Sequence, residues 1–166
     1  MITINPEFLQ DNLFKLTGKD WMLICAGNID KYNMMTASWG SYGVLWNKHI
    51  AMIFIRPTRY TYQFVESNNY FTLNFFDNTH RDLLNLMGAK SGREINKMNH
   101  PGLDANKTSL GNVYFRQARI VLECKKIYAD YIKPEMFLDS KIEKLYPKKD
   151  YHRFFIGEIL NCNRQS

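Results

Sequence analysis

Cysteine is scarce in this chain of 166 residues, and the three that occur, Cys25, Cys124 and Cys162, lie far apart. No two of them form a CxxC pair, so a disulfide framework is not indicated and burial as small core residues is expected. The four histidines have no histidine four residues away and no cysteine nearby. This spacing argues against a zinc site.

Long apolar runs and targeting signals are also missing. No run approaches the roughly 18 residues needed to cross a bilayer, and the N-terminal MITINPEFLQDN lacks the basic and then apolar pattern of a secretory signal. We therefore expect a cytoplasmic protein with no membrane partner. Because the chain shows no repeat, no low-complexity stretch and no linker, its length predicts one domain over residues 1–166.

The short catalytic motifs are absent as well. The sequence contains no GxGxxG, no Walker phosphate loop and no GxSxG nucleophile elbow. The acids Asp77, Asp82 and Glu94 are isolated, so they give no paired-carboxylate signature. If the protein is an enzyme, a bound cofactor therefore supplies the difficult chemistry.

The net charge of +6 is compatible with nucleic acid, a membrane surface or a phosphorylated small molecule as partner. The lysines and arginines are spread along the chain, however, apart from pairs such as Lys125-Lys126 and Lys148-Lys149. A solvated surface accounts for most of them, and we expect no nucleic-acid partner. A nucleic-acid-binding barrel, suggested by the charge and the 14% aromatic share, is kept as an alternative.

Apolar and β-prone stretches dominate what is present. Strands are predicted at residues 21–27, 34–39, 50–55, 70–76, 113–128 and 153–160. Residues 40–48 suggest turns, and residues 135–146 fit either a helix or a hairpin. Many strands with only short helices between them predict a mainly β protein, a small antiparallel barrel.

Three short helices are predicted from capping signals. Thr58 is a candidate N-cap for a helix over the following residues, and Thr79 with Asp82 forms a capping box for a helix that Gly88 ends. Ser91 and Glu94 repeat the capping box.

The segment IRPTRYT, residues 55–61, is the most informative. A strand ends, Pro57 breaks it, and a helix begins with arginine in its first turn, where a cation is unfavourable for the helix itself. A phosphate held by Arg59, Arg56, the hydroxyls of Thr58 and Thr61, and the helix amides would explain this placement. The alternative is that Arg59 points to solvent.

A second phosphate candidate is SGREINK, where Ser91, Arg93 and Lys97 lie at or near a helix start. Arg93 and Lys97 are four residues apart and so would share one helical face. A solvated basic face explains these residues equally well.

The stretch NMMTASWG, residues 33–40, places three small residues between bulky ones. The small residues Thr36, Ala37 and Ser38 would let a flat ring approach so that backbone N–H groups reach its polar edge. Trp39 or neighbouring aromatics could cover the face of the ring. The alternative is an ordinary core strand followed by a turn.

Taken in order, these stretches resemble the flavin reductase-like family, whose fold is the FMN-binding split barrel. NMMTASWGSYGV is similar to the family's first flavin-contact strand, IRPTRYTYQFVE to its phosphate element and YFTLNFF to the following strand. SGREINK, GLDA, LEC and HRFFIGEI resemble the later landmarks, so that the likeness covers roughly residues 20 to 160. Flavoredoxin-like members are the most similar.

The resemblance implies noncovalent FMN, NADH or NADPH as electron donor, and a homodimer with sites near the subunit interface. Residues implied to line the isoalloxazine are Asn33, Met34, Met35, Thr36, Ala37, Ser38 and Trp39. Residues implied to hold the phosphate or to close over it or the dinucleotide are Arg56, Thr58, Arg59, Thr61, Ser91, Arg93 and Lys97. The chain departs from several members at MGAK, residues 87–90, which lacks their cysteine.

The expected activity is hydride transfer from NAD(P)H to flavin, with electrons passed to a small molecule or a redox protein. No residue is assigned as a general acid or base; the protein would position the nicotinamide and stabilise the anionic reduced flavin. His152 could orient the nicotinamide, although a structural histidine beside a strand is the alternative. A non-catalytic flavin or haem binder of the same fold, with His49 or His152 as haem ligand, is the rival function.

Overall fold

The computed structural model describes residues 1–165 and contains ten strands and three short α-helices. The strands are β1 Ile2–Ile4, β2 Met22–Asn28, β3 Lys31–Ala37, β4 Gly40–Leu45, β5 Lys48–Ile55, β6 Tyr70–Phe75, β7 Ala105–Lys107, β8 Val113–Phe115, β9 Ile120–Tyr131 and β10 Arg153–Arg164. The helices are α1 Leu13–Lys15, α2 Tyr60–Ser67 and α3 Arg81–Ala89, and Leu16–Asp20 extends α1 as a π-helical turn. The expected mainly β fold with short helices is therefore confirmed.

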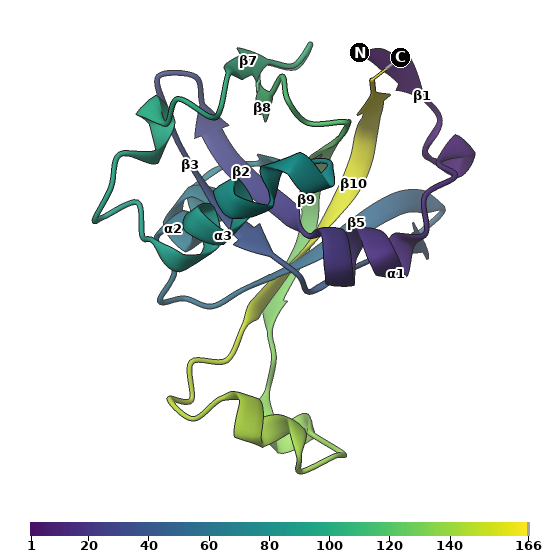
Figure 1. Ribbon diagram of the computed structural model, residues 1–166. Coiled ribbons are helices and arrows are strands. Elements are labelled where there is room, and N and C mark those ends of the chain that lie inside the picture. The colour runs from purple at the N-terminus through teal and green to yellow at the C-terminus, as the bar shows by residue number, and fades with distance from the viewer. Residues whose placement is uncertain (166) are drawn as a thin grey trace.

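Eight strands form one antiparallel sheet in the order β3-β2-β6-β9-β10-β5-β4, with β1 added to β10. β3 and β4 lie at opposite ends of this order, yet only Ser38 and Trp39 separate them in the sequence. The sheet must therefore curl until its two ends meet, which makes it a barrel (Figure 1). Gly40 stands at this junction, where a Cβ would lie 2.9 Å from Met22 Cε and 3.2 Å from Met52 O.

Two hydrophobic cores lie on opposite faces of the strands. Alternation sends Ile24 and Met35 into an inner core that fills the barrel, and sends Leu23 and Met34 into an outer core beneath α3. The three cysteines are all buried: Cys124 and Cys162 in the inner core, Cys25 in the outer one. The expectation that they are small core residues is confirmed.

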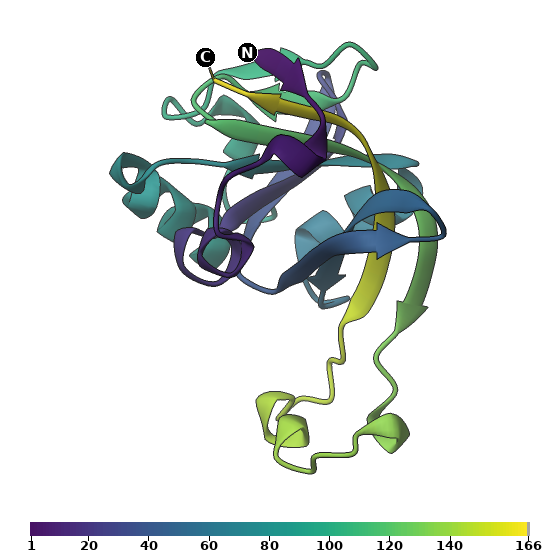
Figure 2. The same ribbon diagram turned by 90° about the vertical axis from the view of Figure 1, so that its right-hand side faces the viewer.

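Residues 132–152, named the arm here, leave the barrel between β9 and β10. Figures 1 and 2 show the arm projecting below the barrel at the end of these two long strands. The backbone N–H of Ile132 donates to the carbonyl oxygen of His152 at 2.8 Å, which closes the base of the arm. Within it lie two 3₁₀ turns, Pro134–Met136 and Ile142–Leu145, so the ambiguous stretch is neither a long helix nor a hairpin.

Several local predictions were wrong. Residues 40–45 form strand β4 rather than turns, and the chain reverses at Trp46 and Asn47, both with positive φ. Arg59 rather than Thr58 is the N-cap of α2, and it makes no side-chain capping bond.

No helix in residues 1–165 is long and apolar enough to span a membrane.

Of the two capping boxes predicted around α3, the one at Thr79 was misread. The one at Ser91 forms, because the Ser91 N–H donates to Glu94 Oε2 at 3.3 Å and Ser91 Oγ accepts from the Arg93 N–H at 3.2 Å, but it begins turns rather than a helix. Asp77, not Thr79, caps the 3₁₀ turn that precedes α3, and α3 runs past Gly88 to Ala89. Gly88 is instead a point of close approach, because its Cβ would lie 3.3 Å from Thr36 Cβ. Residues 91–95 form hydrogen-bonded turns, so Arg93 and Lys97 do not share a helical face.

Candidate functional site

A small pocket lies at the N-terminal end of α2, named the charged pocket here. Its volume is about 100 Å³. It is lined by Asn33, Thr58, Arg59, Tyr60, Thr61, Ala89, Lys90, Ser91, Gly92, Glu94 and Lys97. Three segments distant in the sequence thus converge: β3, the start of α2, and the turns that follow α3.

Buried polar groups fix the floor of the charged pocket. The side-chain amide of Asn33 donates to Thr61 Oγ1 at 2.8 Å, which joins β3 to the first turn of α2. Both residues are nearly fully buried. Because buried polar groups are costly unless they are paired, this bond sets the position of α2 against β3.

Lys97 is buried at the side of the charged pocket, with only 3% of the residue exposed. Its Nζ donates to the carbonyl oxygens of Met34 at 3.1 Å and Met87 at 2.7 Å, so it cross-links β3 to α3. Burial, with a smaller contribution from Arg59, lowers the pKa of Lys97 to about 8. An anion in the pocket would restore the protonated form.

Arg59 supplies the second positive charge. One guanidinium nitrogen, Nη2, donates to the carbonyl oxygen of Gly88 at 2.7 Å, which ties the start of α2 to the end of α3. Burial and the neighbouring Arg56 lower the pKa of Arg59, but arginine remains charged at neutral pH. With the amides of the first turn of α2, Arg59 and Lys97 make the pocket attractive to an anion.

The turn at Ser91 and Gly92 closes the charged pocket. A Cβ on Gly92 would lie 2.3 Å from Asn33 Oδ1 and 2.6 Å from Tyr60 Cδ1, so only glycine fits against β3 and α2. Arg93 points elsewhere: its guanidinium stacks over the Tyr60 ring at 4.8 Å and donates to the carbonyl oxygen of Thr58 at 3.3 Å. Arg93 therefore braces the pocket from outside.

Further along β3 lies a second hollow of about 280 Å³, named the β3 cleft here. Its lining residues are Met35, Thr36, Ala37, Ser38, Trp39, Phe54, Arg56 and His152. The Thr36 hydroxyl is not free, because it donates to the carbonyl oxygen of Leu84 at 2.6 Å. Thr36 and Ala37 are half-buried and Ser38 is exposed, so three small residues lie along one wall of the cleft.

Arg56 and His152 connect the β3 cleft to the arm. Arg56 Nη1 donates to Asp150 Oδ1 at 2.7 Å and Nη2 to the carbonyl oxygen of Leu145 at 2.9 Å, while the guanidinium lies 5.0 Å from the centre of the Tyr146 ring. His152 Nδ1 lies 2.9 Å from the Tyr146 hydroxyl. Burial and Arg56 lower the pKa of His152 to about 4, so its imidazole is neutral at pH 7.

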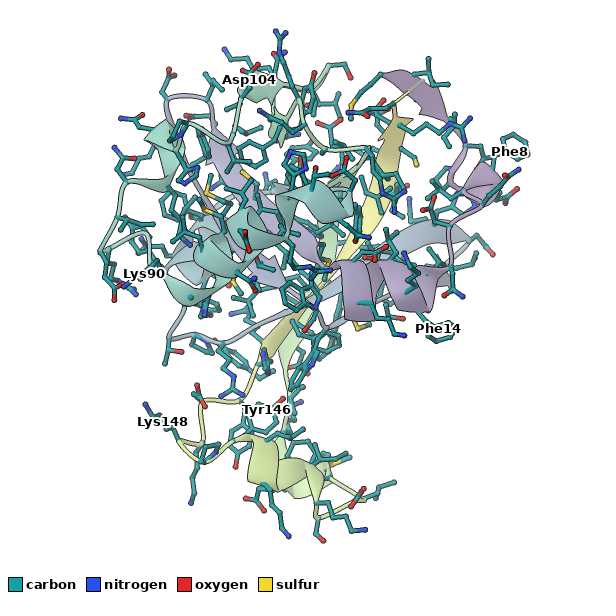
Figure 3. All side chains as sticks on the ribbon, viewed as in Figure 1. Phe8, Phe14, Lys90, Asp104, Tyr146 and Lys148 are labelled. Atoms are coloured by element: carbon teal, nitrogen blue, oxygen red, sulfur yellow. The ribbon has the colours of Figure 1, made fainter. Side chains whose placement is uncertain are left out.

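A third and larger hollow of about 690 Å³, named the apolar cavity, opens beside the β3 cleft. It lies between α1, β4 and the arm, and it shares Ser38, Trp39 and Phe54 with the cleft. Figure 3 shows Phe14 on the outer side of α1 and Tyr146 where the arm meets the barrel. Both residues belong to the wall of the apolar cavity.

The structure brings most of the predicted site residues together, in two groups. Asn33, Thr58, Arg59, Thr61, Ser91 and Lys97 line the charged pocket, and Met35, Thr36, Ala37, Ser38, Trp39 and Arg56 line the β3 cleft. Two lie elsewhere: Met34 is fully buried in the outer core, and Arg93 is outside the charged pocket. Arg56, predicted for the phosphate, lines the β3 cleft and is hydrogen-bonded to the arm.

Sequence reasoning missed Gly92, Phe54 and Tyr146. Alternation in IAMIFI could have identified Phe54, since Ile53 and Ile55 point into the barrel and Phe54 must point out. Nothing in the local sequence marks Gly92 or Tyr146, because their roles depend on contacts with distant segments.

An antiparallel split barrel with an anion-attracting pocket and a cleft of small residues on one strand defines a flavin-binding type of protein. The chain belongs to the family described as flavin reductase like domain, whose family description matches residues 17–166. Because this match covers most of the chain, the resemblance seen in the sequence is confirmed. The family is one of flavin-binding oxidoreductases.

Solved structures show the same fold at low sequence identity. The chain is similar to an FMN-binding protein from Thermus thermophilus, with 16% identity, TM-score 0.70 and coverage of 100% of this chain and 83% of that one. It is also similar to a flavoredoxin from Methanosarcina acetivorans, with 19% identity, TM-score 0.70 and coverage of 100% of this chain and 76% of that one. For an NADH:FAD oxidoreductase from Streptomyces globisporus the identity is 14% and the TM-score 0.66, with coverage of 88% of this chain and 74% of that one. No curated protein sequence matches the chain.

The residues present fit a flavin mononucleotide. The charged pocket, with buried Lys97, half-buried Arg59 and the first amides of α2 around a space of about 100 Å³, fits a phosphate group. The β3 cleft fits a flat ring at the small residues 36–38. Asn33 and Trp39 are six residues apart, roughly 20 Å of extended chain, so an elongated ligand could reach from one hollow to the other.

Proposed function

We propose that this protein is an FMN-dependent oxidoreductase that accepts hydride from NADH or NADPH and passes the electrons to an acceptor. The observation that carries the proposal is the succession of charged pocket and β3 cleft along a single strand, β3. The Streptomyces relative, whose structure contains NAD and FAD fragments, supports a nicotinamide donor. The charged pocket has about the size of one phosphate monoester, and this size supports FMN as the flavin.

In this proposal each hollow has a separate task. Arg59, Lys97 and the first amides of α2 hold the phosphate and set the position of the ring. The backbone at residues 36–38 contacts the ring edge, where N–H groups stabilise negative charge as it develops. Bound FMN supplies the two-electron chemistry, which is why the chain needs no general acid or base.

In this proposal His152 contacts the nicotinamide at the β3 cleft. It lines the cleft, and its ring lies 5.0 Å from that of Trp39, measured between centroids. Because its imidazole is neutral at pH 7 and held by Tyr146, it offers an uncharged, rigid surface. Each candidate haem ligand has one ring nitrogen in a hydrogen bond. His152 uses Nδ1 with the Tyr146 hydroxyl, and His49 uses Nε2 with Glu7 Oε1 at 3.0 Å.

A homodimer is proposed on the family resemblance, and one surface supports it. Trp46, Tyr128, Phe154 and Phe54 form a continuous aromatic strip across the outside of the barrel, with successive ring centroids 6.0 to 6.1 Å apart. Trp46 is 55% exposed and Tyr128 45% exposed. Exposed aromatic residues gathered in one patch are typical of protein interfaces. Light scattering of the purified protein measures its oligomeric state directly.

Anaerobic titration tests the proposed activity. The visible flavin absorption of the FMN-loaded protein should bleach on adding NADH or NADPH, and the nucleotide that bleaches it faster is the donor. Bound flavin that neither nucleotide bleaches would indicate a non-catalytic carrier or sensor. Failure to bind flavin at all would contradict the proposal.

A further inference from the structure

The apolar cavity is much larger than a passage by which a ligand could enter the β3 cleft would need to be. Its volume of about 690 Å³ lies within the roughly 300–1,000 Å³ of small-molecule sites. It shares Ser38, Trp39 and Phe54 with the β3 cleft. A molecule in the cavity would therefore adjoin whatever ring occupies the cleft.

The walls of the apolar cavity are uncharged. Among the described residues that line it, none is acidic or basic, and much of the wall comes from Leu13, Phe14, Phe54, Ile142 and Leu145. A charged ligand would lose its hydration there without gaining a counter-charge. This composition disfavours the pyrophosphate of a dinucleotide, the phosphate of free FMN and an anionic ferric chelate.

Two serine hydroxyls lie on this apolar wall. Ser38, directly after β3, and Ser41, in β4, both line the cavity, whereas the hydroxyl of neighbouring Tyr42 already donates to Met22 Sδ at 3.5 Å. Hydroxyls can donate hydrogen bonds to carbonyl oxygens of a ligand. A flat molecule with an apolar body and carbonyl groups matches this distribution.

We propose that the apolar cavity binds the electron acceptor and that this acceptor is a neutral, flat quinone. The inference rests on the proposed function, since it requires reduced flavin in the β3 cleft. The reaction would balance: reduced FMN bound in the cleft would give up the hydride of its N5–H bond to form an O–H bond on the quinone, and one proton from the reduced flavin or solvent would complete the hydroquinone. The flavin would be oxidised by two electrons and the quinone reduced by two.

Equilibrium dialysis of the oxidised, FMN-loaded protein tests binding without turnover. The probes are menadione, a neutral naphthoquinone, and 1,4-naphthoquinone-2-sulfonate, which carries a negative charge on a similar ring. Menadione should bind at least about tenfold more tightly, because the sulfonate must leave water for an uncharged wall. Equal affinities, or tighter binding of the sulfonate, would overturn the proposal.

A matched pair of arm variants tests whether the quinone binds in the apolar cavity. Ile142→Asp puts a carboxylate in the cavity wall, at a residue 38% exposed and so tolerant of the change. Leu138→Asp makes the same kind of change on the same arm, at a fully exposed residue outside the wall. Ile142→Asp should weaken menadione binding about tenfold or more, and Leu138→Asp should leave it unchanged. Both variants should keep wild-type FMN affinity.

Three outcomes would be distinct failures. If NAD(P)H bleaches the flavin but menadione neither binds nor restores its colour anaerobically, the acceptor inference fails and the proposed function stands. If flavin does not bind or bleach, the proposed function itself fails. If wild-type dimers become monomers in Ile142→Asp and menadione does not bind wild type, a second copy covers the cavity and the quinone proposal is wrong.

Discussion

The charged pocket and the apolar cavity lie on either side of the β3 cleft and differ in almost every physical respect. The charged pocket is about 100 Å³, is bounded by buried Lys97 and half-buried Arg59, and is held by hydrogen bonds between neighbouring elements. The apolar cavity is about 690 Å³, uncharged among its described lining residues, and bounded by the barrel, α1 and the arm.

If both proposals hold, this difference separates cofactor retention from the choice of electron acceptor. Charge-assisted bonds to buried groups in a small pocket bind one anionic group tightly and in one orientation. An apolar wall binds by burial and discriminates mainly by size and charge. Substitutions in the pocket should therefore change flavin affinity, whereas substitutions in the cavity wall should change the acceptor.

The largest effect is expected from Arg59→Ala. Loss of a charge-assisted contact should weaken FMN binding by about 1.5–3 kcal/mol, or roughly 10- to 150-fold, as measured by fluorescence titration of FMN. Riboflavin, which has no phosphate, should bind both proteins equally. Arg93→Ala is the control, because Arg93 lies outside the charged pocket and should change FMN affinity by less than about threefold.

If Arg59→Ala binds FMN like the wild type, the phosphate does not occupy the charged pocket. If Arg93→Ala is the more damaging change, the phosphate lies on the outer side of the turn at residues 91–95. Either result would remove the contrast between pocket and cavity.

A smaller effect is expected from pH, through Lys97. A phosphate prefers the protonated form, so FMN binding should be strongest below a pH of about 8 and should weaken as pH rises through that pKa. The loss between pH 7 and 9 should reach about tenfold. Lys97→Met should abolish this slope, and riboflavin should not show it. A slope that persists in Lys97→Met would assign the titration to another group.

The smallest effect is expected from Arg56→Ala. Its partners lie in the arm, so FMN affinity should stay within about twofold, while the free energy of unfolding in urea should fall by about 1 kcal/mol. Arg56 lowers the pKa of Asp150, so this stability is present above the usual carboxyl pKa and is lost as pH falls through the lowered value. A loss of FMN affinity equal to that of Arg59→Ala would return Arg56 to the phosphate.

Sequence reasoning predicted the barrel and much of the charged pocket because both depend on local signals. Alternation and small residues in β3, and the break at Pro57 before Arg59, are properties of neighbouring residues. The capping predictions at Thr58 and Thr79 failed for a different reason. In each case the observed cap lies one or two positions away, at Arg59 before α2 and at Asp77 before the 3₁₀ turn that leads into α3, and the local sequence did not distinguish between the neighbouring candidates.

The apolar cavity could not be predicted from the sequence. Leu13, Phe54 and Ile142 are apolar residues in unrelated segments, and only the closure of the barrel and the path of the arm place them together. The contact of Arg56 with the arm could not be predicted for the same reason: its sequence position near Arg59 gave no sign that the arm, almost a hundred residues later, would bind it.

The three buried thiols give the barrel its own probes of local opening. Desolvation raises the pKa of Cys25 and Cys124, and that of Cys162 to about 11, so each reacts with an alkylating reagent only when its strand is exposed. Because they lie on β2, β9 and β10, their labelling rates under native conditions report the free energy of opening at three places. Uniform rates would mean that the barrel opens as one cooperative unit; faster labelling at one strand would identify where it first separates.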